Sequence, residues 1–331
     1  MISGADRPSF TVVREDEPIA AALRRAVVAI GNFDGVHRGH RELIARARSL
    51  AARERVPSAI LSFSPHPRAF FAPDKPFFRI TPASEKIAVI AALGVDGVVI
   101  RRFDASLAGT SAADFFERFI LQEFEASGVV VGHDFHFGKG REGTPDVLRA
   151  LCERNDVACD IVPVVEETGA AISSSAIREA LAAGEIAKAN RLLGYRWFVQ
   201  GEVRHGEKRG RDLGYPTANM RLSDGCGLRH GIYAVRMRVD GVMRDGVASF
   251  GRRPTFDNGA PLLETFLFDF SGDLYGKQVG VEFVGWIRGE ERFESVGALS
   301  VQMDADSLRA REFLAAGDGA PSILAGDALT R

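Results

Sequence analysis

The stretch Ile30-Gly31-Asn32-Phe33-Asp34-Gly35-Val36-His37-Arg38-Gly39-His40 joins a short apolar run, residues 26–30, to a helical pattern over residues 40–54. A buried strand that leads through a glycine-rich turn into a helix commonly forms an anion site, because free N–H groups and the positive end of the helix dipole meet there. Gly31, Gly35 and Gly39 allow a ligand to approach the backbone closely. His37 and His40 are three residues apart, which places them on one side of the helix start.

This turn differs from the two familiar phosphate-binding loops. It matches neither G-x-G-x-x-G nor G-x-x-x-x-G-K-[ST]. The motif H-x-G-H, His37 to His40, resembles the nucleotidyltransferase superfamily, whose members transfer AMP or CMP and release pyrophosphate. The alternative is a structural turn with two incidental histidines, which the clustering of histidine, glycine and aspartate at a strand-to-helix junction disfavours.

Length and composition indicate an ordinary globular protein of two domains. The chain has 331 residues, 46% of them hydrophobic, and a net charge of −2. The balanced charge gives no reason to expect nucleic acid or a membrane as a partner. An odd number of cysteines with no zinc-binding spacing favours a reducing, cytoplasmic location. We find no secretory signal, and no apolar run reaches the length of about 18 residues that a membrane helix needs.

Residues 27–193 alternate between apolar strands and amphipathic helices, which predicts a parallel, doubly wound sheet. The expected strands are 26–30, 58–63, 97–100, 128–131 and 160–165, and the expected helices are 40–54, 84–93 with Ser84 as N-cap, 112–123, 145–154 and 185–193. Ligands of such sheets collect at the carboxyl ends of the strands.

Three further loops that follow strands carry groups suited to phosphates or bases. They are residues 64–68, which include His66 and Pro67, residues 132–143, which include Asp134 and Phe135, and residues 172–178, which include Ser174, Ser175 and Arg178. One serine of the last loop could simply cap a helix, but hydroxyls, helix N–H groups and Arg178 together would form a phosphate clamp. We interpret residues 138–141 as a basic loop that closes over a nucleotide, with a solvated charged turn as the alternative.

Beyond Tyr195 the hydrophobic period changes from 3.6 to 2, which predicts an antiparallel β-barrel. The expected strands are 197–204, 232–239, 242–250, 262–270 and 279–287, with a tight turn at Asp240-Gly241. Residues 307–314 form the expected closing helix, and residues 315–331 a loose tail.

Two features of this half suggest phosphoryl transfer. The glycine-rich, basic stretch of residues 201–214 suits ATP phosphates, and Thr217 and Asn219 then offer two oxygen ligands on alternate positions for Mg²⁺. Glu264 shares its predicted strand face with Phe266, Phe268 and Phe270, where a carboxylate would be a suitable base for a sugar hydroxyl. The alternatives are a basic surface loop and an outward-facing glutamate on an edge strand.

Together these motifs resemble the bacterial bifunctional riboflavin kinase/FAD synthetase family over nearly the whole chain, from about residue 27 to residue 314. The synthetase motifs are residues 31–40, 64–67, 132–141 and 172–178. The kinase motifs are residues 210–219, 231–235, 253–256, Glu264, 269–276, 287–288, Glu290 and Phe293. Two positions depart from the family: His136 stands where members commonly have arginine, and Ser249 where they usually have asparagine.

The resemblance implies an N-terminal Rossmann-like nucleotidyltransferase domain, residues 1–194, and a C-terminal riboflavin kinase barrel, residues 195–314, which we expect to fold alone. It implies that ATP and Mg²⁺ convert riboflavin to FMN, and that ATP then converts FMN to FAD with release of pyrophosphate. The predicted catalytic residues are His37, His40, Arg178 and Glu264, and the predicted metal ligands are Thr217 and Asn219. The predicted nucleotide-binding residues are Gly31, Asn32, Phe33, Asp34, Gly39, Ser174, Ser175, Gly210, Arg211, Gly214 and Pro216. The predicted flavin-binding residues are His66, Pro67, Asp134, Phe135, Arg288 and Glu290.

Two other classes of protein stay open at this point. The first is a different nucleotidyltransferase, which would have no counterpart of the barrel half. The second is a non-catalytic flavin-binding regulator, which Thr217, Asn219 and Glu264 argue against, as does the lack of a basic DNA-binding segment. The expected partners are therefore small molecules, namely riboflavin, FMN, FAD and ATP, and weak self-association is left open.

Overall fold

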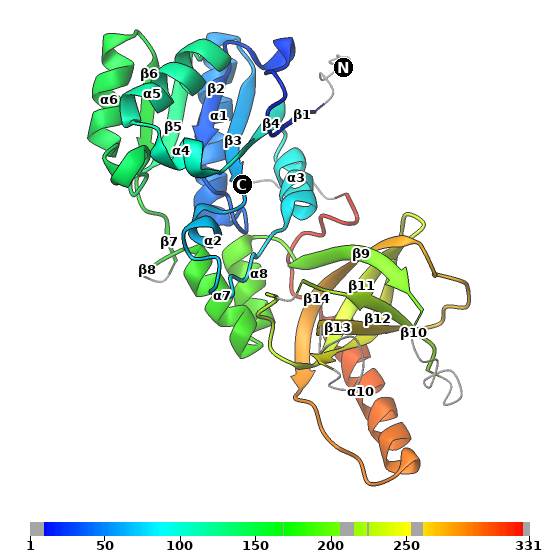
Figure 1. Ribbon diagram of the computed structural model, residues 1–331. Helices are drawn as coiled ribbons and strands as arrows, with labels where there is room; N and C mark the ends of the chain where they lie inside the picture. The colour runs from blue at the N-terminus through cyan, green and yellow to red at the C-terminus, as the bar shows by residue number, and fades with distance from the viewer. Residues whose placement is uncertain (1–9, 168, 206–214, 224, 253–260, 327–331) are drawn as a thin grey trace, which may run out of the picture. The chain divides into compact units, whose positions relative to one another are not determined.

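The computed structural model describes residues 10–167, 169–205, 215–223, 225–252 and 261–326. The chain divides into two compact units (Figure 1). The first unit contains Met1–Phe77 and Lys86–Ile172, and the second contains Phe78–Glu85 and Ser173–Leu329.

A six-stranded sheet in the order β1-β4-β3-β2-β5-β6 forms the centre of the first unit. All of its neighbouring strands pair in parallel, which confirms the predicted sheet type. The strands are β1 Thr11–Arg14, β2 Val27–Ile30, β3 Ser58–Ser64, β4 Gly97–Arg102, β5 Gly128–Gly132 and β6 Ala158–Val162. Strand β2 is buried along its whole length, as expected for a central strand with helices on both faces.

Helices precede or follow most of these strands. They are η1 Ala21–Leu23, α1 Arg38–Glu54, α2 Pro67–Phe71, α3 Ala83–Ala92, α4 Ala105–Gly109, α5 Ala112–Phe115, η2 Phe116–Glu123, η3 Lys139–Arg141 and α6 Pro145–Arg154. A two-stranded ribbon, β7 Glu166–Glu167 and β8 Ala170–Ala171, follows. The expected cap at Ser84 is wrong, because α3 already begins at Ala83. Strand β6 ends at Val162, three residues earlier than predicted, where Pro163 cannot donate to a neighbouring strand.

The predicted helix over residues 112–123 changes type part-way. Only Ala112–Phe115 is α-helical, and Phe116–Glu123 forms a π-helix. Its side-chain pairs follow the wider turn, since Gln122 bonds to Glu117 and Arg118 to Glu123, each five residues apart. A wider turn of this kind is rare, and the apolar pattern alone cannot distinguish it from an α-helix.

The second unit contains a closed barrel in the order β10-β13-β12-β11-β14-β9, and all its pairings are antiparallel. The strands are β9 Phe198–Arg204, β10 Thr217–Arg221, β11 Gly231–Val239, β12 Val242–Arg252, β13 Pro261–Leu267 and β14 Gln278–Arg288. The predicted turn between β11 and β12 is confirmed, because Asp240 and Gly241 both have positive φ, 48° and 84°, as this tight turn requires.

The alternation predicted for β11 is also present. Tyr233, Val235 and Met237 are buried at 0–1% exposure, whereas Arg238 on the opposite face is exposed. Strand β13 is shorter than expected and ends at Leu267, and Asp269 then takes a positive φ of 53°. Because the strand ends before Phe270, the alternation of the strand does not place Phe270 on the same face as Glu264.

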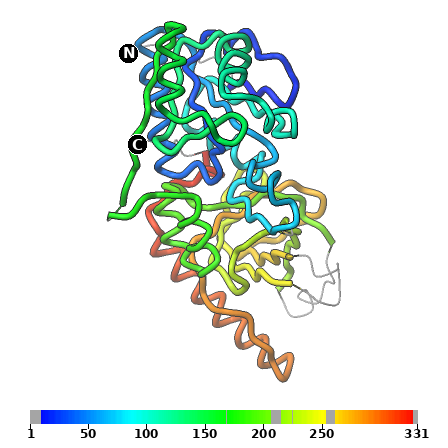
Figure 2. Tube along the Cα trace, turned by 60° about the vertical axis from the view of Figure 1, so that its left-hand side comes forward, coloured from blue at the N-terminus to red at the C-terminus, as the bar shows by residue number. Residues whose placement is uncertain are grey.

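The closing helix α10, Val296–Ala316, is much longer than the predicted residues 307–314. Ser295 caps it by accepting a hydrogen bond from the Ala298 N–H, and Val301 in its first half is 70% exposed. Its second half packs on the outside of the barrel, where Ala310 and Leu314 join Ala234, Phe268 and Val284 in one cluster. Figure 2 follows the chain from the barrel into this helix, drawn in orange and red.

Two helices and the chain end pack on the barrel as part of the same unit. Helices α7 Ser174–Ala183 and α8 Ile186–Leu193 precede β9, and Asn190 of α8 donates to the Phe283 carbonyl of β14. The expected loose tail is wrong for its described part. Ile323 and Leu324 are buried, and Glu282 accepts bonds from Ser322 and the Leu324 N–H.

Candidate functional sites

Three of the predicted binding loops lie at neighbouring strand ends in the first unit. The turn of His37 follows β2, the loop of His66 follows β3 and the loop of Asp134 follows β5. These strands are adjacent in the order β3-β2-β5 and run in parallel, so their carboxyl ends share one edge of the sheet. That edge is where ligands bind in open α/β sheets.

The turn after β2 has an unusual backbone. Phe33, Gly35 and Val36 take positive φ values of 48°, 87° and 39°. Positive φ is unfavourable for phenylalanine and most of all for β-branched valine, and such conformations are concentrated at functional sites. Phe33 and Asp34 are buried, at 0% and 2% exposure, so neither residue is open at the surface.

His37 and His40 lie together at the start of α1. His37 is the N-cap, and its Nδ1 accepts a hydrogen bond of 3.3 Å from the His40 N–H. The two rings stack at a centroid distance of 3.7 Å and an interplanar angle of 18°. A Cβ on Gly39 would lie 3.1 Å from the His37 ring, so glycine suits the close approach of ring and backbone.

His40 is held in its neutral form. Burial, followed by the positive charges that His37 and Lys86 can carry, lowers its pKa well below 6.5. Its Nδ1 is buried and has no hydrogen-bond partner among the described residues. A buried polar atom without a partner is costly, which is consistent with an atom that a ligand or water satisfies.

Sequence reasoning missed Lys86, on α3. Its side chain is 7% exposed, and its Nζ donates to the Asn32 carbonyl at 2.7 Å and to the Ser62 Oγ at 3.0 Å. Ser62 donates to the same carbonyl at 3.1 Å. The signal in the sequence was a lysine within an otherwise largely apolar helix, and only the fold shows that it reaches the turn after β2.

His66 and Pro67 begin helix α2, where His66 Nδ1 accepts from the Arg68 N–H. An aromatic group that we did not predict stands beside them. Phe70 and Phe71 of α2 contact Phe103 with centroid distances of 5.4 Å and 5.8 Å, and Phe71 is 67% exposed. Exposed aromatic rings of this kind offer stacking surfaces to a planar ligand.

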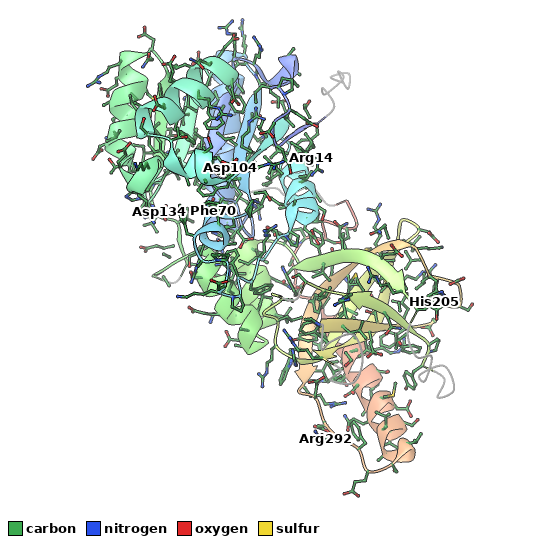
Figure 3. All side chains as sticks on the ribbon, in the orientation of Figure 1. Arg14, Phe70, Asp104, Asp134, His205 and Arg292 are labelled. Carbon is green, nitrogen blue, oxygen red and sulfur yellow. The ribbon has the colours of Figure 1, made fainter. Side chains whose placement is uncertain are left out.

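In the loop after β5, Asp134 is exposed (Figure 3). Its backbone carbonyl lies 2.9 Å from His136 Nδ1. Phe135 stacks on Phe137 with centroids 5.4 Å apart and is partly buried against the sheet core. The guanidinium of Arg141 lies 3.2 Å from His136, so a cation is present at this departure from the family pattern.

The serine run and Arg178 fall in the second unit. Ser173 is the N-cap of α7 and accepts from the Ala176 N–H at 3.2 Å, which leaves Ser174 and Ser175 in the first helical turn. The Nε of Arg178 donates to the Phe78 carbonyl at 2.7 Å.

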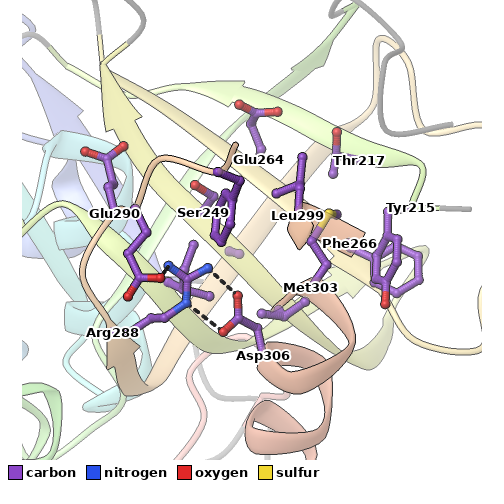
Figure 4. A pocket seen from close by; sticks show the side chains of 15 residues that line it. Tyr215, Thr217, Ser249, Glu264, Phe266, Arg288, Glu290, Leu299, Met303 and Asp306 are labelled. Carbon is purple, nitrogen blue, oxygen red and sulfur yellow. Dashed lines mark hydrogen bonds and ion pairs between the residues drawn. The ribbon is translucent and has the colours of Figure 1, made fainter. Parts of the chain in front are cut away.

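The barrel carries a pocket of about 410 Å³ between its outer face, the loop after β14 and helix α10 (Figure 4). Thr217, Glu264 and Arg288 line it, and so does Ser249. Phe266, Leu299 and Met303 supply apolar walls, and the Tyr215 ring packs at an angle of 56° against Phe266, with centroids 4.7 Å apart. The pocket thus joins an apolar surface to a few polar groups, which is typical of small-molecule sites.

Strand register brings the predicted kinase residues together. Asn219 of β10 stands directly opposite Glu264 of β13, and Thr217 stands opposite Phe266. Directly opposed residues have Cβ atoms about 4.5–5.5 Å apart and share a face of the sheet. Ser249 of β12 stands opposite Glu264 on its other side.

Arg288 and Glu290 lie at the other end of this pocket. Arg288 forms two parallel hydrogen bonds to Asp306 of α10, of 2.8 Å and 2.7 Å, and Asp306 is 5% exposed. The bidentate hydrogen bonds to Asp306 raise the pKa of Arg288, and this effect outweighs burial, which lowers the pKa. The same two bonds fix the plane of the guanidinium group. Glu290 lies across Gly251, whose missing Cβ leaves room for the carboxylate, and 3.6 Å from His230.

Gly210, Arg211 and Gly214 lie outside the described residues, as do residues 206–214 as a whole and the 253–256 motif. Pro216 is exposed directly before β10. Within the described residues, no group of three or more His, Cys, Asp or Glu side chains could hold a metal. In the same part of the chain, every helix is too short or too polar to cross a membrane.

Comparison with known proteins matches both units. Residues 19–176 match the FAD synthetase family model, and residues 193–314 match the riboflavin kinase family model. A Pseudomonas fluorescens protein named bifunctional riboflavin kinase/FMN adenylyltransferase is 40% identical over 293 residues, which cover 88% of this chain and 94% of the relative. The chain belongs to the bifunctional riboflavin kinase/FMN adenylyltransferase family.

Other relatives agree with this assignment. The Escherichia coli K12 protein of the same name is 39% identical over 87% of this chain and 92% of its own. A solved Streptococcus pneumoniae structure, described as a macrolide-efflux protein, has a TM-score of 0.81 and 32% identity over 91% of this chain and 98% of its own. The expected fold and both expected transferase activities, riboflavin kinase and FAD synthetase, are thereby confirmed. A different nucleotidyltransferase and a non-catalytic regulator are disfavoured.

Proposed function

We propose that the turn after β2 is the adenylylation site and that the barrel pocket is the kinase site. The observation that supports this most is that one pair of predicted catalytic or metal-binding residues comes together within each unit. His37 and His40 stack in one unit, and Asn219 and Glu264 stand opposite each other in the other. We assign adenylylation to residues 1–194 and phosphorylation to residues 195–314, with residues 173–194 packed on the barrel.

For FAD formation, a phosphate oxygen of FMN attacks the α-phosphorus of ATP, and the bond to the bridging oxygen breaks to release pyrophosphate. The nucleophile is already anionic, so no strong base is needed, and catalysis consists of orientation and charge stabilisation. Neutral His40 donates or accepts a hydrogen bond without repelling Lys86. N–H groups at the start of α1 bind phosphate, together with His37. The catalytic role of Arg178, which lies in the second unit, stays a prediction.

The flavin ring of FMN stacks on the aromatic group Phe70, Phe71 and Phe103 beside His66 and Pro67. Asp134 and Phe135 belong to the neighbouring loop on the same sheet edge, at the end of β5. Asn32, Asp34, Gly31 and Gly39 shape the turn. Ser174 and Ser175 lie in the second unit and stay predicted nucleotide contacts.

For FMN formation, the Glu264 carboxylate takes the proton of the ribityl hydroxyl as its oxygen attacks the γ-phosphorus of ATP, and ADP leaves. The apolar walls formed by Phe266, Leu299 and Met303 hold the flavin, oriented by Arg288 and Glu290. Gly210, Arg211, Gly214 and Pro216 stay predicted phosphate contacts.

Thr217 and Asn219 suit a hard cation, because their oxygens come from alternate residues of one strand, next to the carboxylate of Glu264. A bound Mg²⁺ would neutralise charge on the ATP phosphates. Mg²⁺ dependence, a cytoplasmic location and weak self-association stay predictions.

One chromatographic assay tests this assignment. Protein, riboflavin, ATP and Mg²⁺ are mixed, and FMN and FAD are followed over time. We expect FMN to appear first and FAD after it. Formation of FAD from riboflavin by a variant unable to make FMN would contradict two consecutive sites.

A further inference from the structure

The salt bridge between Arg288 and Asp306 joins the barrel to helix α10 at one end of the barrel pocket (Figure 4). Arg288 is the last residue of β14, and Asp306 lies one helical turn before Ala310, which is buried against the barrel. The Asp306 carboxylate accepts two hydrogen bonds from Arg288, at 2.8 Å and 2.7 Å, and one from the Gln302 amide at 3.0 Å. At 5% exposure, the carboxylate is held in one place.

Three of the five N–H groups of the Arg288 guanidinium have partners among the described residues. Two donate to Asp306, and one donates to the Gly289 carbonyl at 2.9 Å. The other two belong to the two terminal nitrogens, and Arg288 lines the cavity of about 410 Å³. Because the guanidinium is planar and paired in a bidentate manner, the directions of these two donors are fixed as well. Arg288 therefore keeps two oriented donors for a ligand in the cavity.

Strand register relates Arg288 to Glu264. Arg288 stands opposite Ile232 of β11, which stands opposite Ser249 of β12. Ser249 in turn stands opposite Glu264 of β13, and all four residues line the pocket. Three strand spacings of about 4.8 Å separate Glu264 from Arg288, roughly 14 Å along the sheet. A base at one end and two donors at the other suit an elongated substrate, with a hydroxyl at Glu264 and carbonyl oxygens at Arg288.

We propose that Asp306 is a positioning residue for riboflavin phosphorylation, which holds the Arg288 guanidinium so that its two remaining N–H groups bind carbonyl oxygens of the flavin ring. The proposal rests on the assignment of the kinase reaction to this pocket. Asp306 acts through Arg288 and does not itself touch the flavin. Without Asp306 the long arginine side chain loses its fixed orientation, so the flavin binds more weakly and is aligned less well with Glu264.

The experiment compares variants of the full-length protein in the riboflavin kinase assay. Asp306→Asn keeps the size of the side chain but leaves one oxygen to accept from Arg288. Arg288→Lys keeps the charge but cannot form the bidentate pair. Glu312→Gln is the matched control, because Glu312 is an exposed carboxylate of the same helix, paired with Arg309. FAD formation from supplied FMN verifies that the other unit is intact in each variant.

For Asp306→Asn we expect the KM for riboflavin to rise about 10-fold, with the KM for ATP changing less than about twofold. Arg288→Lys should show the same pattern. The double variant Arg288→Lys/Asp306→Asn should lie within about twofold of Arg288→Lys, because the two side chains act as one unit. Glu312→Gln should have the KM of the wild type. A purely structural role of Asp306 would lower the melting temperature without raising the KM for riboflavin.

Three results would overturn the proposal: an unchanged KM for riboflavin in Asp306→Asn, an equal rise in Glu312→Gln, or effects of Asp306→Asn and Arg288→Lys that multiply in the double variant. If Asp306→Asn does not fold, Asp306→Glu decides in its place, since it keeps the ion pair and displaces the guanidinium. A raised KM for riboflavin then supports the proposal, and an unchanged one refutes it. Glu264→Gln tests the pocket itself: normal riboflavin phosphorylation there would disprove the assignment of the kinase site, whatever Asp306 does.

Discussion

The imidazole rings of His37 and His40 stack on each other, with centroids 3.7 Å apart. The stack exists because His37 caps α1 and accepts a hydrogen bond from the His40 N–H, which folds the first ring over the second. A doubly protonated pair would be strongly repelled at this distance, so at most one ring carries a charge. Burial and the neighbouring His37 lower the pKa of His40, so the pair offers a neutral His40 ring to a ligand.

Replacing both rings by His37→Ala/His40→Ala should stop FAD formation and spare FMN formation. The loss removes preorganised donors at the site of charge development, for which reductions of about 10²- to 10³-fold are typical. The two activities are measured separately, with riboflavin or FMN as substrate. FMN formation by the same variant serves as the internal control for its folding. A folded double variant that has lost both activities would argue against separate sites.

The stability of the first unit should decrease as the pH falls below about 6.5. Burial lowers the pKa of His40 in the folded state, so between that pKa and 6.5 the unfolded chain binds a proton that the folded chain does not. The free energy of unfolding therefore rises with pH in this window, by at most about 1.4 kcal/mol per pH unit for this group. His40→Asn should remove this part of the slope.

Both tryptophans, Trp197 and Trp286, are in the second unit, so fluorescence does not report this transition. Hydrogen exchange of core amides in β2 and β3 at pH 5–7 is the suitable measurement. Identical slopes for the wild type and His40→Asn would refute the prediction.

The sequence predicted those elements that a strong local signal determines. The buried strand before Gly31, the helix after His37, helix α6 with its proline at Pro145 and the Asp240-Gly241 turn are all present. Edge strand β1 was missed, because a four-residue strand at a sheet edge has little pattern of its own. The π-helix and the first half of α10 were missed because spacing and capping, rather than apolar period, determine them.

The candidate sites show the same limit. Histidines in a glycine-rich turn and a carboxylate among aromatics can be read from short motifs, whereas contacts between distant segments cannot. Lys86 is 54 residues from Asn32, and Asp306 is 18 residues from Arg288. These two contacts can be recognised only once the fold shows which helix packs on which sheet.

Glu264→Gln should abolish FMN formation while FAD formation from supplied FMN persists. The amide keeps the size of the side chain but cannot accept the hydroxyl proton, and loss of a general base typically costs about 10²- to 10⁴-fold in rate. Glu202→Gln, an exposed glutamate of strand β9, is the matched control. Kinase turnover within threefold of the wild type would remove Glu264 from the mechanism.

Ending the chain after Gly317 should destabilise the barrel unit. Ile323 and Leu324 are buried at 8% and 4% exposure, and Leu324 packs against Gly280 of β14. Loss of two such side chains costs about 3–6 kcal/mol. Thermal unfolding followed by tryptophan fluorescence measures the change, and a chain that ends after Gly326 keeps these contacts and is the control. Equal melting temperatures for the two truncations would show that the chain end contributes nothing.

Asn190→Ala should weaken the barrel although it lies outside the barrel strands. Its side chain donates to the Phe283 carbonyl at 3.0 Å and accepts from the Trp197 N–H at 2.8 Å, and it is 1% exposed. Buried groups left without partners cost about 1–3 kcal/mol each. For the same reason, we expect a fragment that begins at Tyr195 to be less stable than one that begins at Ser173. The midpoints of urea unfolding are compared for the wild type and Asn190→Ala, and for the two fragments. A fragment from Tyr195 that is as stable as the one from Ser173 would contradict this.

Mixing two inactive proteins tests the central claim most directly, since the claim is that separate sites act in sequence on one flavin. His37→Ala/His40→Ala and Glu264→Gln are incubated with riboflavin, ATP and Mg²⁺, singly and together, and the products are separated by chromatography. We predict that the first variant stops at FMN, the second leaves riboflavin unchanged, and the mixture forms FAD. Absence of FAD from the mixture, with each protein folded and its remaining activity intact, would contradict the account.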